Sequence, residues 1–315
     1  MSVLKGKLVT LIGGSGFFGT HVAQALLERG ARLRVASRNP KDAFSLRPLA
    51  NLGQIQFARC DIRSEASLAA VIDGADAVVN LVGAFAGDLN AVMGEGAGDV
   101  ARIAAAKGVS ALVHVSAIGA DAASDIDYQK YKGEGELHVL AAFPKATVLR
   151  PSILFGSDDQ FLNMFGGMIA AMPVMPVFAP DAKLQPLFVD DAAEAVVAAL
   201  EDPAKHGGKI YEIAGPEVVT MLDLNERIAA AQGRNRHFAA LPDMVGSAIA
   251  TASGFLPGAP ISGDQYKMLA QGNVASDDMP GIAKLGIQPR PLSLFLDRWM
   301  VRYRKHGRFG DERAA

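Results

Sequence analysis

The sequence predicts an α/β protein in which a doubly wound parallel sheet is joined to a smaller C-terminal α/β domain. From residue 7 to about residue 155, short β-branched segments alternate with alanine-rich helical segments, which is typical of βαβ units. A glycine-rich turn joins the first strand to the first helix. After residue 157 the rhythm changes, with more proline and methionine. We therefore predict domains at 1–157 and 158–315, with segments around 185–215 returning to the first domain.

The first domain is expected to contain six strands and at least three helices. Each strand segment is short and rich in β-branched residues, and each helical segment is rich in alanine and leucine. The strands are predicted at 7–13, 32–37, 55–60, 76–83, 111–116 and 146–152, and the helices at 20–30, 65–74 and 96–108.

The second domain offers two further strands, at 184–190 and 208–215, and two helices, at 190–203 and 220–233. Asp190 or Asp191 is expected to cap the first of these helices, and Thr220 the second. Two uncharged stretches, 160–180 and 244–263, are long enough to span a membrane. Glycine and proline interrupt both stretches, so we interpret them as buried core.

Composition excludes several classes of protein. Half of the 315 residues are hydrophobic, and 31 Lys and Arg stand against 33 Asp and Glu, for a net charge of -2. The chain therefore has no overall excess of positive charge of the kind that binds nucleic acid. Cys60 is the single cysteine, which excludes an internal disulfide framework and favours a reducing, cytoplasmic compartment. The six histidines show no metal-ligand spacing, and the N-terminus shows no signal peptide pattern, so we predict neither metal nor export.

Gly13, Gly16 and Gly19 form a G-x-x-G-x-x-G turn between the first strand and an amphipathic helix. In a βαβ unit such glycines allow a tight turn, close approach of a pyrophosphate, and close packing of helix and strand. The helix N-terminus then faces the phosphates. The sequence therefore predicts a dinucleotide site.

The end of the second strand predicts which dinucleotide is preferred. NAD-selective sites place an acidic residue there to accept the ribose hydroxyls. Here the chain reads Ala36, Ser37, Arg38. Because Arg38 can pair with a 2'-phosphate, we predict NADPH in preference to NADH.

Tyr128 and Lys132 follow the fifth strand and are four residues apart, so they share one helix face. An ammonium group beside a tyrosine lowers the pKa of the phenol and can also bind the cofactor ribose. The pair is therefore a candidate for cofactor contact, for catalysis, or for both.

The succession of motifs resembles the short-chain dehydrogenase/reductase superfamily, in its extended, atypical (Rossmann) form, over nearly the whole chain. The matching residues are GGSGFFG at 13–19, Arg38, CDI at 60–62, NLVG at 80–83, the Tyr128 and Lys132 pair and LRPSILFG at 149–156. Within this superfamily the sequence is similar to the alpha-subcomplex subunit 9 family of respiratory complex I. Segments 150–165, 185–200, 208–217 and 261–276 carry that narrower resemblance.

The resemblance implies a tightly held NADPH with a structural role. It implies that the phosphates are held by Ser15, Gly16, Phe17, Phe18 and Arg38, the adenine by Asp61 and Ile62, the ribose side by Leu81 and Val82, and the nicotinamide end by Pro151. Active members carry a Ser or Thr at the end of the fifth strand, where this chain has Ser116 followed by Ala117. If Ala117 occupies the active position, one donor to the substrate carbonyl is missing.

The C-terminal segment 291–315 combines an apolar face, which includes Trp299, with Arg298, Arg302, Arg304, Lys305 and Arg308. A basic amphipathic helix of this kind can bind outside its own domain, on an anionic membrane surface or in the groove of a partner, or it can dock on its own domain.

We therefore expect an NADPH-binding accessory or assembly-supporting subunit of complex I, located in the cytoplasm or peripherally on the cytoplasmic face of the inner membrane. One alternative is an NADP(H)-dependent oxidoreductase or epimerase that acts through Tyr128 and Lys132. Another is a regulator that senses the redox state of the nucleotide.

Overall fold

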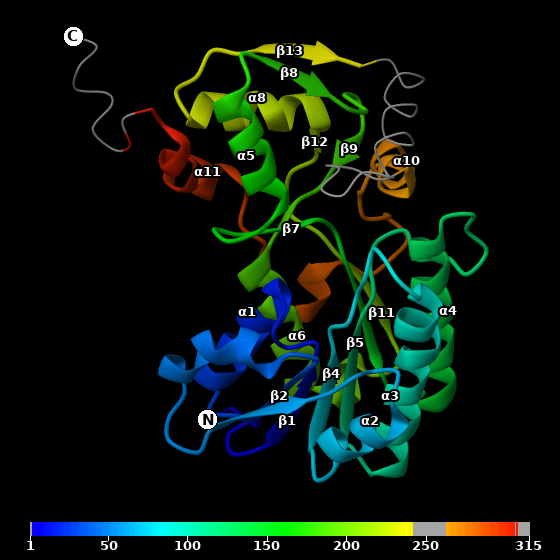
Figure 1. Cartoon of the computed structure of the whole chain (residues 1–315). Coiled ribbons are helices and arrows are strands. Elements are labelled where there is room, and N and C mark those ends of the chain that lie inside the picture. Colours follow the sequence, from blue (N-terminus) through cyan, green and yellow to red (C-terminus); the bar gives the residue numbers. More distant parts are fainter. Residues whose placement is uncertain (1, 242–262, 306, 308–315) are drawn as a thin grey trace. The chain divides into compact units, whose positions relative to one another are not determined.

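The computed structural model describes residues 2–241, 263–305 and 307 (Figure 1). The chain divides into two compact units, and later segments return to the first. Unit 1 comprises Met1–Pro151, Val189–Ile213 and Ala275–Gln288, and unit 2 comprises Ser152–Phe188, Ala214–Val274 and Pro289–Ala315. The first change of unit falls a few residues before the predicted boundary.

Unit 1 is built on a seven-stranded sheet with the order β11-β6-β5-β4-β1-β2-β3, in which all neighbours are parallel. All six predicted strands are present, and the segment around 210 supplies the seventh. Strand order reverses between β1 and β4, so a ligand crevice is expected at their carboxyl ends. The bounds are β1 Leu8–Ile12, β2 Arg32–Ser37, β3 Ile55–Arg59, β4 Ala77–Asn80, β5 Ala111–Val115, β6 Thr147–Pro151 and β11 Ile210–Ile213.

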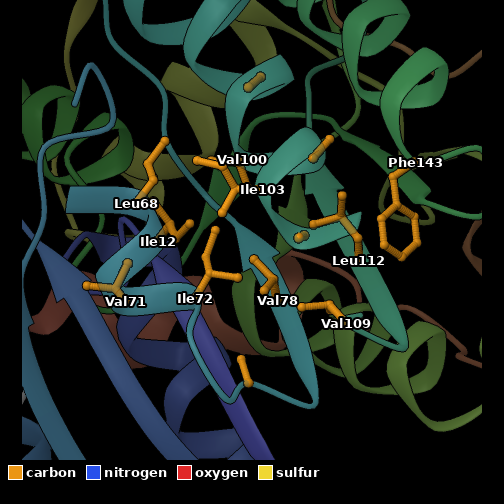
Figure 2. Packing of buried hydrophobic residues seen from close by; sticks show 14 of the residues in the cluster. Ile12, Leu68, Val71, Ile72, Val78, Val100, Ile103, Val109, Leu112 and Phe143 are labelled. Carbon is orange, nitrogen blue, oxygen red and sulfur yellow. The ribbon is translucent and has the colours of Figure 1, made fainter. Parts of the chain in front are cut away.

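Helices cover both faces of this sheet. On one face, α2 (Glu65–Ile72), α3 (Glu95–Ala106) and α4 (Asp127–Ala142) pack on the sheet, and Figure 2 shows Ile12, Val78 and Leu112, from three neighbouring strands, in this core. On the other face lie α1 (Phe17–Glu28) and α6 (Val189–Glu201), which contact each other. The shorter turns of unit 1 are η1 Pro40–Leu49, a π-helical turn η2 Asn90–Gly94, α7 Pro203–His206 and η3 Ile282–Leu285.

Unit 2 has short strand pairs and four described α-helices. The pairs are β7 Leu154–Phe155 with β10 Leu187–Phe188, β9 Lys183–Leu184 with β12 Val219–Thr220, and β8 Val174–Val177 with β13 His237–Ala240. The helices are α5 Phe161–Ala171, α8 Met221–Ala231, α10 Gly263–Gln271 and α11 Ser293–Met300, the last followed by η4 Val301–Tyr303.

The two predicted helix caps have different outcomes. The Thr220 hydroxyl accepts the amide of Asp223 at 3.1 Å and caps α8, as expected. The prediction for Asp190 or Asp191 is wrong, because α6 already begins at Val189 and both carboxylates lie in its first turn. Acidic side chains in a first turn still favour the helix through its dipole.

The first uncharged stretch, 160–180, forms α5 and β8. Of the second, residues 244–262 lie outside the described residues. Among the helices that the structure describes, none has the length and apolar character needed to cross a bilayer.

The C-terminal helix α11 packs its apolar face within unit 2. Leu292, Leu296 and Met300 are buried. The rings of Phe295 and Trp299 stack 4.8 Å apart, and Phe295 also stacks on Phe188 at 4.2 Å. Of the two interpretations of this segment, docking on its own domain is therefore the one seen for residues 292–303. The basic residues Arg298 and Arg302 stay exposed, and Arg308 lies outside the described residues.

Candidate nucleotide site

The glycine turn follows β1 and has the three properties expected of it. Gly13 has a φ of +83°, and a Cβ there would lie 3.1 Å from Val82 Cγ2. A Cβ on Gly19 would lie 2.7 Å from the Cα of Gly14, so helix and turn touch at backbone distance. Gly16 has only a carbonyl oxygen at 3.5 Å from such a Cβ. The turn is therefore tight at both ends and open in the middle.

The N-terminus of α1 is suited to bind an anion. The helix begins at Phe17, and its N-cap Gly16 has no side chain to accept a hydrogen bond. The amides of Phe17, Phe18 and Gly19 lack intrahelical acceptors by geometry, and the helix dipole adds positive potential there. Ser15 is half-buried and Gly16 is exposed beside these amides. This arrangement can hold phosphate groups.

At the end of β2, Ser37 is buried, and its hydroxyl has no hydrogen-bond partner in the part of the chain that the structure describes. Arg38 follows and is exposed. At the end of β3, Asp61 binds the guanidinium of Arg63 through both oxygens at 3.0 and 2.7 Å. This ion pair lowers the pKa of Asp61 to about 2. Ile62 is buried beside it.

The chain that follows β4 runs against the glycine turn. The amide of Leu81 donates to the carbonyl of Ile12 at 2.9 Å, and the amide of Val82 donates to Asn80 Oδ1 at 3.2 Å. Leu81 and Val82 are half-buried. Unit 1 therefore places the ends of β1 and β4 side by side, at the switch point where a nucleotide is expected.

Lys132 is buried beneath this point. Its ammonium donates to the carbonyls of Val82 and Val115, at 3.2 and 2.9 Å. Burial lowers the pKa of Lys132 to about 8, opposed by the carboxylate of Glu136. Two backbone carbonyls at the ends of β4 and β5 therefore fix the ammonium.

Tyr128 lies one turn earlier on α4, as the spacing predicted, and its ring stacks on Phe85. Burial raises the pKa of Tyr128 to about 12. The direction is opposite to the one that proton transfer at neutral pH requires. The sequence therefore predicted the shared helix face, while burial, rather than the ammonium of Lys132, governs the pKa of the phenol.

The end of β5 contributes side chains that point into the protein. Ser116 is 3% exposed, and its hydroxyl has no partner among the described residues. Ala117 is half-exposed. Pro151, the last residue of β6, accepts the amide of Ile118 at 3.1 Å. Ser116 is thus turned inward, and the more exposed position lacks a hydroxyl.

Sequence reasoning missed a buried polar group behind the site. Asn80 Nδ2 and His114 Nδ1 lie 3.2 Å apart, and burial lowers the pKa of His114 to about 3. Arg150 binds Glu136 at 2.7 Å and Glu212 at 3.3 Å, which links β6, α4 and β11. The available signal was the presence of polar residues within otherwise apolar strand segments.

A metal site is not seen in the described residues, where no group of three His, Cys, Asp or Glu side chains is arranged to hold an ion. Cys60 is a buried free thiol, and burial raises its pKa.

Comparison with known proteins agrees with this geometry. The profile of an NAD(P)H-binding family matches residues 13–154, which run from the glycine turn after β1 to just past the end of β6 and contain all of the candidate site residues. The alpha subcomplex subunit 9 of NADH dehydrogenase [ubiquinone] from Arabidopsis thaliana is 30% identical over 97% of this chain and 80% of its own length. The chain belongs to the subunit 9 family.

A second member of the subunit 9 family, from Mus musculus, is 30% identical over 93% of this chain and 79% of its own length. An NADPH-dependent quinone oxidoreductase from Escherichia coli, solved with NADPH, has a TM-score of 0.73 at 20% identity and covers 92% of this chain and 99% of its own. At that identity the likeness shows the fold, a Rossmann-type sheet flanked by helices. Unit 1 of this subunit 9 family member is thus an NAD(P)H-binding domain.

Proposed function

We propose that this chain is an NADPH-binding accessory or assembly-supporting subunit of respiratory complex I, in which the nucleotide has a largely structural role. The observation that carries the proposal is membership of the subunit 9 family across nearly the whole chain, including both units. Those relatives are subunits of NADH dehydrogenase, and we extend that assignment to this chain.

The structural role of the nucleotide is supported by the state of the candidate catalytic groups. A reductase needs a tyrosine that releases its proton readily and a hydroxyl that binds the substrate carbonyl. Here the pKa of Tyr128 is about 12, Lys132 is bound to two carbonyls, and Ser116 is turned inward. These features favour binding over turnover.

We propose NADPH over NADH because the end of β2 offers Ser37 and Arg38 to a 2'-phosphate and no carboxylate to ribose hydroxyls. The remaining proposed contacts surround the switch point at the ends of β1, β3, β4 and β6. They are Gly13, Ser15, Gly16, Phe17, Phe18, Gly19, Asp61, Ile62, Leu81, Val82, Tyr128, Lys132 and Pro151.

A bound nucleotide stabilises the native state by RT ln(1 + [L]/Kd), about 2.7 kcal/mol at a hundredfold excess over Kd. The test is native co-purification of the tagged chain from gently solubilised membranes. Co-migration with complex I subunits and one non-exchanging NADPH is the expected result. A free chain that exchanges its nucleotide would contradict the proposal.

The second candidate is an NADP(H)-dependent oxidoreductase or epimerase. It is favoured by the placement of Tyr128 and Lys132 on one face of α4, beside the end of β4. Substrate-dependent loss of NADPH absorbance that disappears in Tyr128→Phe would establish it. Unchanged loss in that variant would remove Tyr128 from the chemistry.

We also propose a peripheral position on the cytoplasmic face of the inner membrane, reached mainly through protein partners. The apolar face of α11 is already packed, so the contribution left to this segment is electrostatic, about 1 kcal/mol per basic residue near an anionic surface. Replacing the exposed Arg298 and Arg302 by Gln tests this contribution and leaves the packed face of α11 in place. Membrane recovery that stays unchanged in this variant would exclude it.

A further inference from the structure

The loop between β4 and the π-helical turn η2 carries one aromatic side chain. Residues 83–89 read GAFAGDL, in which Phe85 is flanked by alanine and glycine. Phe85 is 62% exposed. Its ring stacks on Tyr128 with centroids 4.7 Å apart and planes within 13° of parallel.

Both ends of this loop are held by hydrogen bonds. At the start, Lys132 donates to the carbonyl of Val82 at 3.2 Å. At the end, Asp88 Oδ1 accepts the amide of Ala91 at 3.0 Å, in the first turn of η2. Single π-helical turns occur frequently at functional sites. Hydrogen bonds at both ends therefore hold the loop in the position where Phe85 contacts Tyr128.

We propose that Phe85 shields Tyr128. Its ring covers one face of the Tyr128 ring and restricts the access of carbonyl compounds to the Tyr128 hydroxyl. The inference rests on the proposed function, because it explains how a bound NADPH is kept from being consumed. A stacked aromatic pair contributes about 0.5–1.5 kcal/mol. Because 1.4 kcal/mol corresponds to a factor of ten in an equilibrium constant, the stacked position of Phe85 is favoured over an unstacked one by about two- to tenfold.

The reaction restricted in this way is the reduction of a carbonyl group. Hydride would pass from C4 of NADPH to the carbonyl carbon, the C=O π bond would break, and the oxygen would take the proton of the Tyr128 hydroxyl. The products are an alcohol and NADP⁺, and water returns a proton to the phenolate. Tyr128 is half-buried, and burial raises its pKa.

The test compares Phe85→Ala with the wild type and with Phe85→Tyr, which retains a stacking ring. Each protein is loaded with NADPH, and oxidation at 340 nm is followed with 4-nitrobenzaldehyde as the probe. Leu137→Ala is the matched control, because Leu137 is a 60% exposed apolar residue on the same helix as Tyr128. Phenolate absorbance is followed against pH for each protein, and subtraction of the same protein carrying Tyr128→Phe gives the pKa of Tyr128.

We expect Phe85→Ala to oxidise NADPH about two- to tenfold faster than the wild type and to lower the pKa of Tyr128, with no change in Phe85→Tyr or Leu137→Ala. Equal rates in Phe85→Ala and wild type, with NADPH still bound, would overturn the inference and leave the proposed function standing. Loss of bound NADPH from Phe85→Ala would also overturn it, since Phe85 would then belong to the nucleotide site. Rapid turnover by the wild type would instead defeat the structural role of NADPH.

Discussion

Replacing Lys132 by Met tests whether the ammonium beneath the nucleotide site is truly buried. Lys132 is 3% exposed and donates to the carbonyls of Val82 and Val115. Its pKa falls from 10.5 to about 8 because burial penalises the charged form. The folded protein therefore loses this proton near pH 8, while the unfolded chain keeps it up to about pH 10.5.

The sign and size of the effect follow from proton linkage. Between pH 8 and pH 10.5 the unfolded state binds more protons at this site, so the free energy of unfolding rises with pH. The shift from 10.5 to about 8 corresponds to about 3 kcal/mol at 1.36 kcal/mol per pKa unit. Lys132→Met lacks this titrating group. The difference in unfolding free energy between wild type and variant therefore cancels the contributions of the other titrating groups.

The assay is urea unfolding of nucleotide-free wild type and Lys132→Met at pH 7, 8, 9 and 10. We expect the stability of the wild type relative to the variant to rise by about 2 kcal/mol from pH 7 to pH 10. A difference that stays flat over this range would refute the reasoning, because the ammonium would then be as well solvated as in the unfolded chain. NADPH affinity at pH 7 should fall in Lys132→Met if the ammonium also binds the ribose.

Three further substitutions, one of them with a matched control, test the site and its support. Arg38→Ala should weaken NADPH binding by roughly ten- to hundredfold and leave NADH unchanged in calorimetric titrations, and equal losses for both would contradict the 2'-phosphate assignment. Gly19→Ala should destabilise the fold by about 1–3 kcal/mol in urea, because its Cβ would meet Gly14 at 2.7 Å, whereas Gly16→Ala, in open space, should fold normally. Arg150→Met should cost about 3–5 kcal/mol, since it leaves the buried carboxylates of Glu136 and Glu212 unpaired, and a smaller loss in urea unfolding would show that water reaches them.

The sheet of unit 1 was predictable because local sequence and long-range packing agree there. Buried parallel strands need continuous β-branched segments, and the helices between them repeat their apolar residues with a helical period. The glycine turn was predictable for a similar reason: the tight contacts of Gly13 and Gly19 admit no side chain. Strands of only two residues in unit 2 carry too little periodicity to be recognised.

The environment of the Tyr128 and Lys132 pair could not be predicted from spacing. Four residues on a helix place two side chains on one face, as α4 confirms. The carbonyls that bind Lys132 come from residues 82 and 115, and the ring that stacks on Tyr128 comes from residue 85. These contacts depend on how β4 and β5 end, which a local pattern does not encode.

The surface on which the C-terminal helix packs could not be predicted from its own sequence either. An apolar face flanked by arginines predicts an amphipathic helix equally well for a membrane surface and for a protein core. Only the rings of Phe188, Phe295 and Trp299, which come from separate parts of unit 2, decide that α11 packs on its own unit. The partner of an amphipathic helix is a tertiary property.

The polar groups beneath the switch point bear on what the site binds. The buried hydroxyls of Ser37 and Ser116 have no hydrogen-bond partner in the described part of the chain. The ammonium of Lys132 is also buried, and burial disfavours its charged form. Buried polar groups without partners lower the stability of the fold. We therefore expect them to be retained for another reason. A nucleotide whose ribose and phosphate oxygens meet Ser37 and Lys132 would supply the missing acceptors. We therefore expect NADPH to raise the stability of unit 1 by more than NADH at the same free concentration, because the proposed contacts of Ser37 and Arg38 at the end of β2 need a 2'-phosphate.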